Sequence, residues 1–222
     1  MVPCQLRRQP MDIVMLAAGT SSRMGSTNKM LLPYDGIPMV THCCMQALGF
    51  LASFSEQSDT TCRLIVVTGY RRQSVEKALL PCREFIGKTD ARLEMLIVNN
   101  PDYRKGQFSS TKAGVSHVAD GQDFFISLAD MPLVSAGHYA ALVPLLKGHD
   151  AVRPFSEYDG RRVPGHPVLH ASGLRDAMLK CPYTYKVSIF LDKFDVFEPS
   201  FSDPSWILDV DEAKDYKSII GS

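Results

Sequence analysis

The sequence predicts an α/β fold in which a mainly parallel central sheet carries helices on both faces. Short apolar runs alternate with amphipathic stretches along the chain, which is the order expected when strands alternate with helices. The runs Ile13–Ala17 and Phe124–Leu128 are apolar on both faces, as strands covered by helices on both sides should be. Ligands bind such sheets beyond the carboxyl ends of the strands, so a functional site is expected in the loops that follow them.

The first half of the chain begins with a strand, a loop and a long helix. A Gly/Ser loop that extends to Lys29 follows the strand Ile13–Ala17. Pro38 is well placed to open a helix because the first turn does not need its missing N–H group. This helix has apolar residues at helical spacing, namely Val40, Cys43, Cys44, Ala47, Leu48 and Leu51. After the helix, Leu64–Val67 is a second buried strand, ended by Gly69.

Two further helices flank a third strand. We expect a short helix over Ser74–Leu80, stopped before Pro81 because proline disrupts helix interiors. Leu93–Val98 is the third strand, followed by a turn-forming Asn-Asn-Pro segment. Ser109 or Ser110 then caps a helix that runs to about residue 118.

The second half continues the alternation with shorter elements. Ser135 is a good N-cap residue, and an Asp-Gly pair favours a tight turn between two of the strands. The expected elements are strand Phe124–Leu128, a helix from Ser135 to Leu146, strands Ala151–Val152 and Val168–His170 around the turn Asp159-Gly160, helix Gly173–Leu179, strand Trp206–Asp211 and helix Glu212–Ile219.

Composition indicates an ordinary globular protein. The chain has 222 residues, 24 Lys+Arg against 24 Asp+Glu, and 45% hydrophobic residues, so a wholly disordered chain is excluded. Zero net charge argues against a general nucleic-acid binder but not against a local phosphate site. No apolar run reaches the roughly 18 residues that a membrane helix needs, so we expect neither a nucleic-acid nor a membrane partner.

Domain organisation and location follow from the termini and the cysteines. We expect residues 1–10 to be an N-terminal extension and residues 11–222 to be a single domain, with no signal-peptide core near the start. The six cysteines form no Cys-x-x-Cys pair and no zinc-like spacing with histidine. Reduced thiols in a cytoplasmic protein are the expected state.

The loop after the first strand has the composition of a phosphate site. It reads Leu-Ala-Ala-Gly-Thr-Ser-Ser-Arg-Met-Gly from Leu16 to Gly25, and Lys29 follows. Small residues let the backbone approach a bound group, and their N–H groups can bind phosphate oxygens. Arg23 offers a bidentate fork and Lys29 a point charge. The loop matches neither the P-loop nor the dinucleotide fingerprint, and an ordinary surface connection is the alternative.

The run LAAGTSSRMG, with Lys29 and the Leu-Leu-Pro that follows, resembles the signature of nucleotidyltransferases that make nucleoside-diphosphate-linked products. The resemblance covers Asp12 to about Ile219 and implies the Rossmann-like nucleotide-diphospho-sugar transferase fold. Within this superfamily the chain is most similar to the molybdenum cofactor cytidylyltransferase and guanylyltransferase branch. The LAAG form looks like the cytidylyl side of that branch, so CTP is the expected nucleotide.

Acidic residues supply the expected metal site. Asp130 follows the strand Phe124–Leu128, and a carboxylate at such a strand end can ligate Mg²⁺ between phosphates. The resemblance implies this role for Asp130; a turn residue before Pro132 is the alternative. Asp209 and Asp211 share one strand face, and Asp211 is our choice to complete the metal site. Its alternative role is to cap the last helix.

Two further segments look like parts of the family's site. The segment from Asn100 to Ser110 resembles the family pattern NPxxxxGxxSS, which contributes to the base and ribose pocket. The segment Gly160–Val168 resembles the GxxGHP pattern on the acceptor side. The expected catalytic residues are Arg23, Lys29 and Asp130, and the expected acceptor-binding residues are Arg161, Gly165 and His166. The expected nucleotide-binding residues are Leu16, Ala17, Ala18, Gly19, Ser21, Arg23, Gly25, Lys29, Thr68, Asn100, Gly106, Ser109 and Ser110.

The resemblance implies a Mg²⁺-dependent nucleotidyltransferase. The expected reaction moves CMP from CTP to a phosphorylated acceptor, the molybdopterin form of the molybdenum cofactor, and releases pyrophosphate. A guanylyltransferase on the same acceptor and a sugar-phosphate nucleotidyltransferase are alternatives of the same class. A non-catalytic nucleotide-binding chaperone for a molybdoenzyme is an alternative of another class. Transient contact with an apo-molybdoenzyme is a further expectation.

Overall fold

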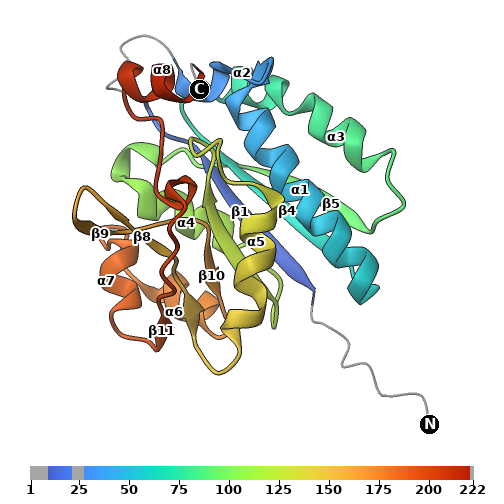
Figure 1. Cartoon of the computed structure of the whole chain (residues 1–222). Helices are drawn as coiled ribbons and strands as arrows, with labels where there is room; N and C mark the ends of the chain where they lie inside the picture. Colours follow the sequence, from blue (N-terminus) through green and yellow to red (C-terminus); the bar gives the residue numbers. More distant parts are fainter. Residues whose placement is uncertain (1–9, 22–27, 221–222) are drawn as a thin grey trace.

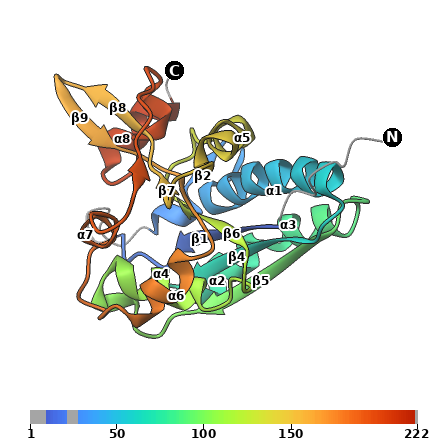
Figure 2. The same ribbon diagram turned by 90° about the horizontal axis from the view of Figure 1, so that it is seen from below.

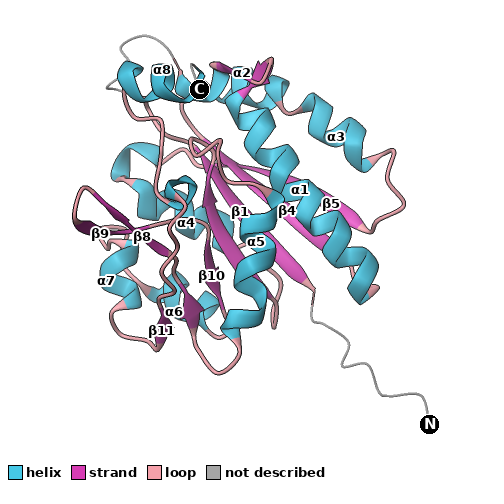
Figure 3. Ribbon diagram, viewed as in Figure 1, coloured by secondary structure: helices cyan, strands magenta, loops and turns pink. Residues whose placement is uncertain are grey.

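The computed structural model describes residues 10–21 and 28–220, and their centre is a seven-stranded sheet (Figures 1 and 3). The strand order is β11-β7-β10-β6-β1-β4-β5, and β10 alone runs antiparallel to its neighbours. This confirms the predicted α/β class with a mainly parallel sheet. The strands are β1 (Met11–Ala17), β4 (Cys62–Thr68), β5 (Leu93–Asn99), β6 (Asp123–Leu128), β7 (Ala151–Val152), β10 (Val168–His170) and β11 (Val196–Phe197).

The register of the four long strands brings their carboxyl ends to one edge. β1 pairs in parallel with β4 on one side and β6 on the other, and β4 pairs in parallel with β5. Ala17 lies opposite Thr68, which lies opposite Asn99. Leu16 lies opposite Leu128 on the other side. The loops that the sequence analysis singled out therefore start side by side at this edge.

Helices cover both faces of the sheet, as the apolar strands required. Figure 2 shows α1 and α5 on one face and α4 and α6 on the other. Ile13 and Met15 of β1 pack in the cluster that includes α1, whereas Val14 and Leu16 pack in the cluster that includes α4. The α-helices are α1 (Met39–Ser58), α2 (Arg72–Ala78), α3 (Leu80–Ile86), α4 (Gln107–Val115), α5 (Ala136–Leu142), α6 (Leu174–Lys180), α7 (Val187–Leu191) and α8 (Ala213–Ile220).

Two helix predictions need comment. The short helix predicted over Ser74–Leu80 is α2, which ends at Ala78 and so stops before Pro81 as expected, but the prediction missed α3, where Pro81 lies in the first turn and its missing N–H is tolerated. α4 begins at Gln107 and has Gly106 as its N-cap, so neither Ser109 nor Ser110 caps it. α1 follows Pro38 as predicted and runs to Ser58. Ser135 is the N-cap of α5, as predicted.

The region after β6 contains features that the pattern did not show. The turn at Asp159 and Gly160 joins β8 (Phe155–Tyr158) to β9 (Arg161–Pro164), a separate antiparallel hairpin (Figure 1). The predicted strand Trp206–Asp211 is wrong. This segment, which is described throughout, leaves the 3-10 helix η5 (Pro204–Trp206) as an irregular loop.

The structure also bears on the expectations for membrane helices, cysteines and the N-terminal extension. Among the described residues, no helix has the length and apolar character to cross a membrane. Five cysteines, at positions 43, 44, 62, 82 and 181, are free thiols. The proposed extension, residues 1–10, lies outside the described residues except for Pro10.

Candidate functional site

A cavity of about 490 Å³ opens at the carboxyl ends of β1 and β6. Its walls come from the loop after β1, the 3-10 helix η2 (Lys29–Leu31), the start of α4 and the segment before α8. Eight of the expected site residues line it: Leu16, Ala18, Gly19, Ser21, Lys29, Gly106, Ser110 and Asp130. Asp211, the residue chosen to complete the metal site, lines it as well. The fold thus gathers residues from four separate parts of the sequence in one cavity.

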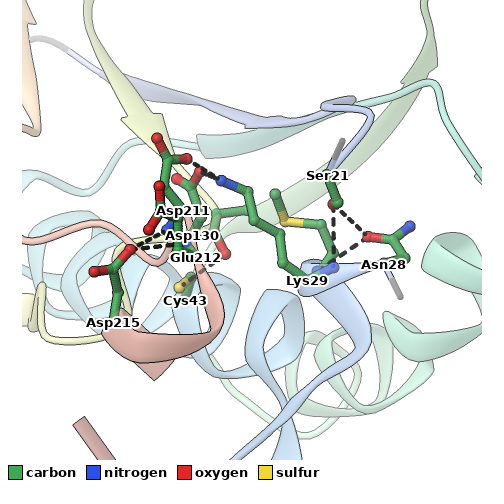
Figure 4. Close-up of polar contacts among 10 residues, drawn as sticks. Ser21, Asn28, Lys29, Cys43, Asp130, Asp211, Glu212 and Asp215 are labelled. Carbon is green, nitrogen blue, oxygen red and sulfur yellow. Dashed lines mark hydrogen bonds and ion pairs between the residues drawn. The ribbon is translucent and has the colours of Figure 1, made fainter. Parts of the chain in front are cut away.

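The loop after β1 is shaped by hydrogen bonds that fix Lys29 (Figure 4). Ser21 Oγ accepts a hydrogen bond from the backbone N–H of Lys29 at 3.1 Å. Asn28 caps η2, because its Oδ1 accepts from the backbone N–H of Met30 at 3.0 Å. Ser21 has φ of 54°, in the left-handed region of backbone conformation. These contacts hold the start of η2 against the cavity.

The Lys29 ammonium lies between two carboxylates. Its Nζ is 2.5 Å from Asp130 Oδ2 and 2.8 Å from Asp211 Oδ1, and its side chain is 8% exposed (Figure 4). Burial by itself lowers the pKa of Lys29, but the charges and hydrogen bonds of the two carboxylates outweigh burial and leave that pKa raised. Lys29 is therefore a fixed positive charge at neutral pH.

Three carboxylates form an acidic cluster at this point. Asp130, Asp209 and Asp211 each offer an oxygen within 4.8 Å of the others. Partial burial and the charges of Asp130 and Asp211 raise the pKa of Asp209 to about 6. An all-oxygen donor set of this kind fits Mg²⁺ or Mn²⁺, and three clustered carboxylates with one lysine retain negative charge for such a cation.

Backbone contacts position the acidic cluster. The Val210 N–H donates to the carbonyl of Asp130 at 2.9 Å, which ties the segment before α8 to the end of β6. Asp215 Oδ2 accepts from the N–H groups of Asp211 and Glu212, at 3.1 and 2.7 Å (Figure 4). Asp215 is thus the side chain that satisfies the N–H groups at the start of α8. Asp209, which the sequence analysis placed second to Asp211, belongs to the same cluster.

Several expected nucleotide-binding residues lie behind the cavity wall rather than on it. Asn100 is buried, and its Nδ2 donates to Ser109 Oγ and Ser110 Oγ, both at 2.9 Å. Ser109 Oγ in turn donates to the Gly106 carbonyl at 2.8 Å. The Asn100 N–H donates to the Thr68 carbonyl at 2.8 Å. Asn100 and Ser109 are therefore placed to hold the α4 N-terminus, where Ser110 reaches the cavity.

The remaining nucleotide-binding expectations fall into two groups. Ala17 and Thr68 are buried at the ends of β1 and β4 and are not among the residues that line the cavity. Thr68 Oγ1 donates instead to Glu76 Oε1 at 3.2 Å. Arg23 and Gly25 lie outside the described residues, so their expected roles stay predictions.

A second cavity, of about 530 Å³, adjoins the first and contains two of the three expected acceptor-binding residues. Gly165 and His166 line it, whereas Arg161 lies on β9 away from its described lining. Gly165 has no room for a side chain, because an added Cβ would collide with the Trp206 carbonyl. The His166 N–H donates to that same carbonyl at 2.8 Å. Burial lowers the pKa of His166, so its ring is neutral at neutral pH.

The two cavities share Gly106 and Gln107 at the start of α4. Gly106 has φ of 107°, a left-handed conformation that favours glycine. Sequence reasoning missed Gln107, Arg153 and the pair Tyr183 and Tyr185 as lining residues. The signal that was available for the last two is the aromatic and basic run Tyr-Thr-Tyr-Lys that starts at residue 183.

A lysine bridged to carboxylates, beside a Gly/Ser loop at the carboxyl edge of a parallel sheet, defines an α/β protein equipped for phosphate and metal chemistry. The chain belongs to the MobA-like NTP transferase family, because the sequence model of that family's domain matches residues 13–195. It is therefore a nucleotidyltransferase of the MobA-like type by family. The match ends before Asp209 and Asp211, so these two acidic residues lie beyond the matched segment.

The chain is also similar to individual proteins and solved structures. The molybdenum cofactor cytidylyltransferase of Escherichia coli is 27% identical over 205 residues, which cover 92% of this chain and 93% of that protein. The nicotine blue oxidoreductase of Paenarthrobacter nicotinovorans is 30% identical over 169 residues, which cover 74% and 72%. The manganese complex of Rv0371C from Mycobacterium tuberculosis has the same fold, with a TM-score of 0.67, 19% identity and coverage of 97% and 100%.

Proposed function

We propose that this chain transfers CMP from CTP to the phosphate of molybdopterin and releases pyrophosphate. The observation that carries the proposal is the contact of Lys29 with Asp130 and Asp211 beside the Gly/Ser loop, at the carboxyl ends of β1 and β6. The cytidylyltransferase relative, which matches nearly the full chain, supports the choice of nucleotide and acceptor. Transient contact with an apo-molybdoenzyme, which would receive the product, is part of the same proposal.

The chemistry needs positioning and charge neutralisation more than proton transfer. An oxygen of the acceptor phosphate attacks the α-phosphorus of CTP and forms a new P–O bond. The bond from the α-phosphorus to the bridging oxygen breaks, and pyrophosphate leaves with that electron pair. A phosphate monoester is already a competent nucleophile, so little general-base help is required.

The residues of the first cavity supply the electrostatics. Lys29 offsets negative charge at the α-phosphorus, and the N–H groups of Ala18 and Gly19 bind phosphate or base oxygens. Arg23 has the proposed role of holding the leaving pyrophosphate. Asp130 with Asp211 would hold Mg²⁺, which when bound neutralises charge on the triphosphate. The manganese in the M. tuberculosis structure supports a divalent cation at this fold.

The second cavity is the proposed acceptor site. It opens beside the first across Gly106 and Gln107, so a bound acceptor could present its phosphate to the nucleotide. The neutral ring of His166 donates from Nδ1 to the Ile126 carbonyl at 3.4 Å, so its Nε2 is left to accept a hydrogen bond from a bound acceptor. Arg161, outside this lining, has no role in the proposal.

Experiment can also test three alternative functions. A guanylyltransferase on the same acceptor or a sugar-phosphate nucleotidyltransferase would use the same first cavity. A non-catalytic chaperone would have no need of Lys29 and the acidic cluster together. The nicotine blue oxidoreductase relative is named for a redox reaction, which releases no pyrophosphate. Release of pyrophosphate therefore separates nucleotidyl transfer from an oxidoreductase or a non-catalytic chaperone.

The test is pyrophosphate release from CTP, GTP, ATP and UTP, each with Mg²⁺ and with or without molybdopterin. We expect release with CTP only when molybdopterin is present. Release with GTP in place of CTP would assign the chain to the guanylyl reaction. Absence of release with every nucleotide and acceptor, from folded protein, would contradict the proposed function.

A further inference from the structure

The ammonium of Lys29 lies between two carboxylates that the proposed function assigns to a divalent cation. It contacts one oxygen of Asp130 and one oxygen of Asp211 (Figure 4). The same proposal gives Lys29 a role at the nucleotide. We propose that Lys29 and the divalent cation compete for Asp130 and Asp211, so that a bound cation displaces the ammonium, which then pairs with an anion in the first cavity. The inference rests on the proposed function in identifying that anion as the phosphate chain of the nucleotide.

The contacts of Lys29 leave no room for a second cation on the same oxygens. Nζ is 2.5 Å from Asp130 Oδ2 and 2.8 Å from Asp211 Oδ1. Mg²⁺ binds carboxylate oxygens at about 2.0–2.1 Å, so a cation on these two oxygens would lie against the ammonium. Two positive charges so close together repel strongly in a partly buried site. Binding of the cation through the other oxygens of the two carboxylates, with Lys29 left in place, is the alternative to displacement.

The acidic residues are held through their backbone as well as by Lys29. The Val210 N–H donates to the Asp130 carbonyl at 2.9 Å, and the Asp211 N–H donates to Asp215 Oδ2 at 3.1 Å. Neither hydrogen bond involves the ammonium. Asp130 and Asp211 can therefore exchange one positive charge for another while the segments that carry them stay in place.

Lys29 is anchored at its backbone, whereas its side chain is able to turn. Its N–H donates to Ser21 Oγ at 3.1 Å, and its carbonyl accepts from the Leu32 N–H at 3.2 Å. Beyond these bonds the ammonium is carried by a flexible four-carbon stem. Space is available beside the loop after β1, since a Cβ added to Gly19, which lines the same cavity, would meet no atom within 4 Å. A displaced ammonium can therefore turn within the first cavity toward this loop.

A displaced ammonium needs another anion. The Lys29 side chain is 8% exposed, and a buried charge without a partner is costly. The anionic side chains in the described lining of the first cavity are the three carboxylates of the acidic cluster, which the cation would engage. A phosphate bound at the loop supplies the missing partner. The cation and the nucleotide therefore strengthen each other's binding, and this coupling acts equally in both directions.

The test measures Mn²⁺ binding without nucleotide, from the electron paramagnetic resonance signal of free Mn²⁺. We expect Lys29→Met, which removes the competing ammonium, to bind Mn²⁺ about tenfold more tightly than wild type, within the roughly 5–150-fold range of coupling between two bound groups. Lys29→Arg keeps a positive charge and should bind Mn²⁺ as weakly as wild type. The matched control is Lys88→Met, at an exposed position between α3 and the start of β5, which should leave the affinity for Mn²⁺ unchanged.

A second measurement uses wild-type protein, so it does not depend on the folding of Lys29→Met. Acetic anhydride acetylates accessible lysine amines, and mass spectrometry locates the modified residues. We expect saturating Mn²⁺, again without nucleotide, to raise the acetylation rate of Lys29 at least about fivefold, the lower end of the same range, and to leave that of Lys88 unchanged.

Neither measurement uses CTP or molybdopterin, so its result is separate from that of the turnover assay. Mn²⁺ binding by folded Lys29→Met no tighter than by wild type, or acetylation of Lys29 unaffected by saturating Mn²⁺, would overturn the inference even if the chain turns over CTP and molybdopterin. Tighter Mn²⁺ binding by Lys29→Met in a chain that releases no pyrophosphate would support the displacement while the proposed function fails.

Discussion

Replacement of Lys29 by methionine tests the electrostatics of the site most sharply. Lys29 Nζ contacts Asp130 and Asp211, and its side chain is 8% exposed. Methionine keeps an unbranched apolar stem of similar length but leaves the cluster of Asp130, Asp209 and Asp211 without its cation. The expected consequence is mutual repulsion of carboxylates at neutral and alkaline pH.

The magnitude follows from burial. Removal of one partner of a buried ion pair costs about 3–5 kcal/mol. Asp211 is 36% exposed, so solvent screens part of the repulsion, and we expect Lys29→Met to lose about 2–3 kcal/mol at about pH 8. The loss should be smaller at about pH 5.5, because protonation of Asp209 then removes one of the repelling charges. Asp209, with its pKa already raised to about 6 beside Lys29, indicates where this relief begins.

Urea unfolding of the metal-free protein at the two pH values measures the effect. Lys214→Met is the matched control. The Lys214 side chain is 78% exposed, and its Nζ forms an exposed ion pair with Glu212 Oε2 at 3.1 Å. This variant should leave the free energy of unfolding equal to that of wild type within the error of the measurement. Mg²⁺ or Mn²⁺ should restore part of the stability of Lys29→Met at about pH 8. An equal loss at both pH values, or no loss, would refute the electrostatic reasoning.

Substitutions at two further positions test other parts of the structure. Burial lowers the pKa of His170 to about 3, so the folded state holds it neutral and stability falls as pH decreases below its unfolded value of about 6.5. His170→Phe should reduce this dependence by roughly 2 kcal/mol between about pH 6.5 and 5 in urea unfolding; a dependence equal to that of wild type would contradict the assignment. Asp215→Ala removes the acceptor for the Asp211 N–H and should raise the Mg²⁺ concentration for half-maximal pyrophosphate release about tenfold, the effect of losing a residue that orients a metal ligand. Asp215→Asn keeps an acceptor oxygen and should retain more metal affinity; identical metal requirements in Asp215→Ala and wild type would count against a positioning role.

The sheet was predictable because its central strands are apolar on both faces. β1 and β6 could be identified from continuous apolar runs, and their parallel pairing follows from the helices between them. The sequence analysis missed α3 because proline has two structural uses. Pro81 is unfavourable in the interior of a helix but favourable in a first turn, so the residue that marks the end of α2 also lies at the start of α3.

The site was predictable in part. The Gly/Ser loop and Asp130 were accessible from sequence, since both follow apolar strands that end at the same edge. The contact of Lys29 with Asp211 joins residues 182 positions apart, and only the folded chain brings them together. The tyrosines of the second cavity were missed because their segment lacks the family pattern, although aromatic and basic residues alternate there.

The most direct test of the proposed reaction is molybdopterin-dependent pyrophosphate release from CTP by wild type and by Asp130→Asn. Asp130 lies in the acidic cluster and contacts Lys29, so the substitution removes one preorganised charge from the site. The matched control is Asp90→Asn, an exposed position before the amino end of β5, at the opposite end of that strand from the site. We expect Asp130→Asn to lower turnover by about 10²-fold or more and Asp90→Asn to match wild type. Full turnover by folded Asp130→Asn would contradict the proposed site.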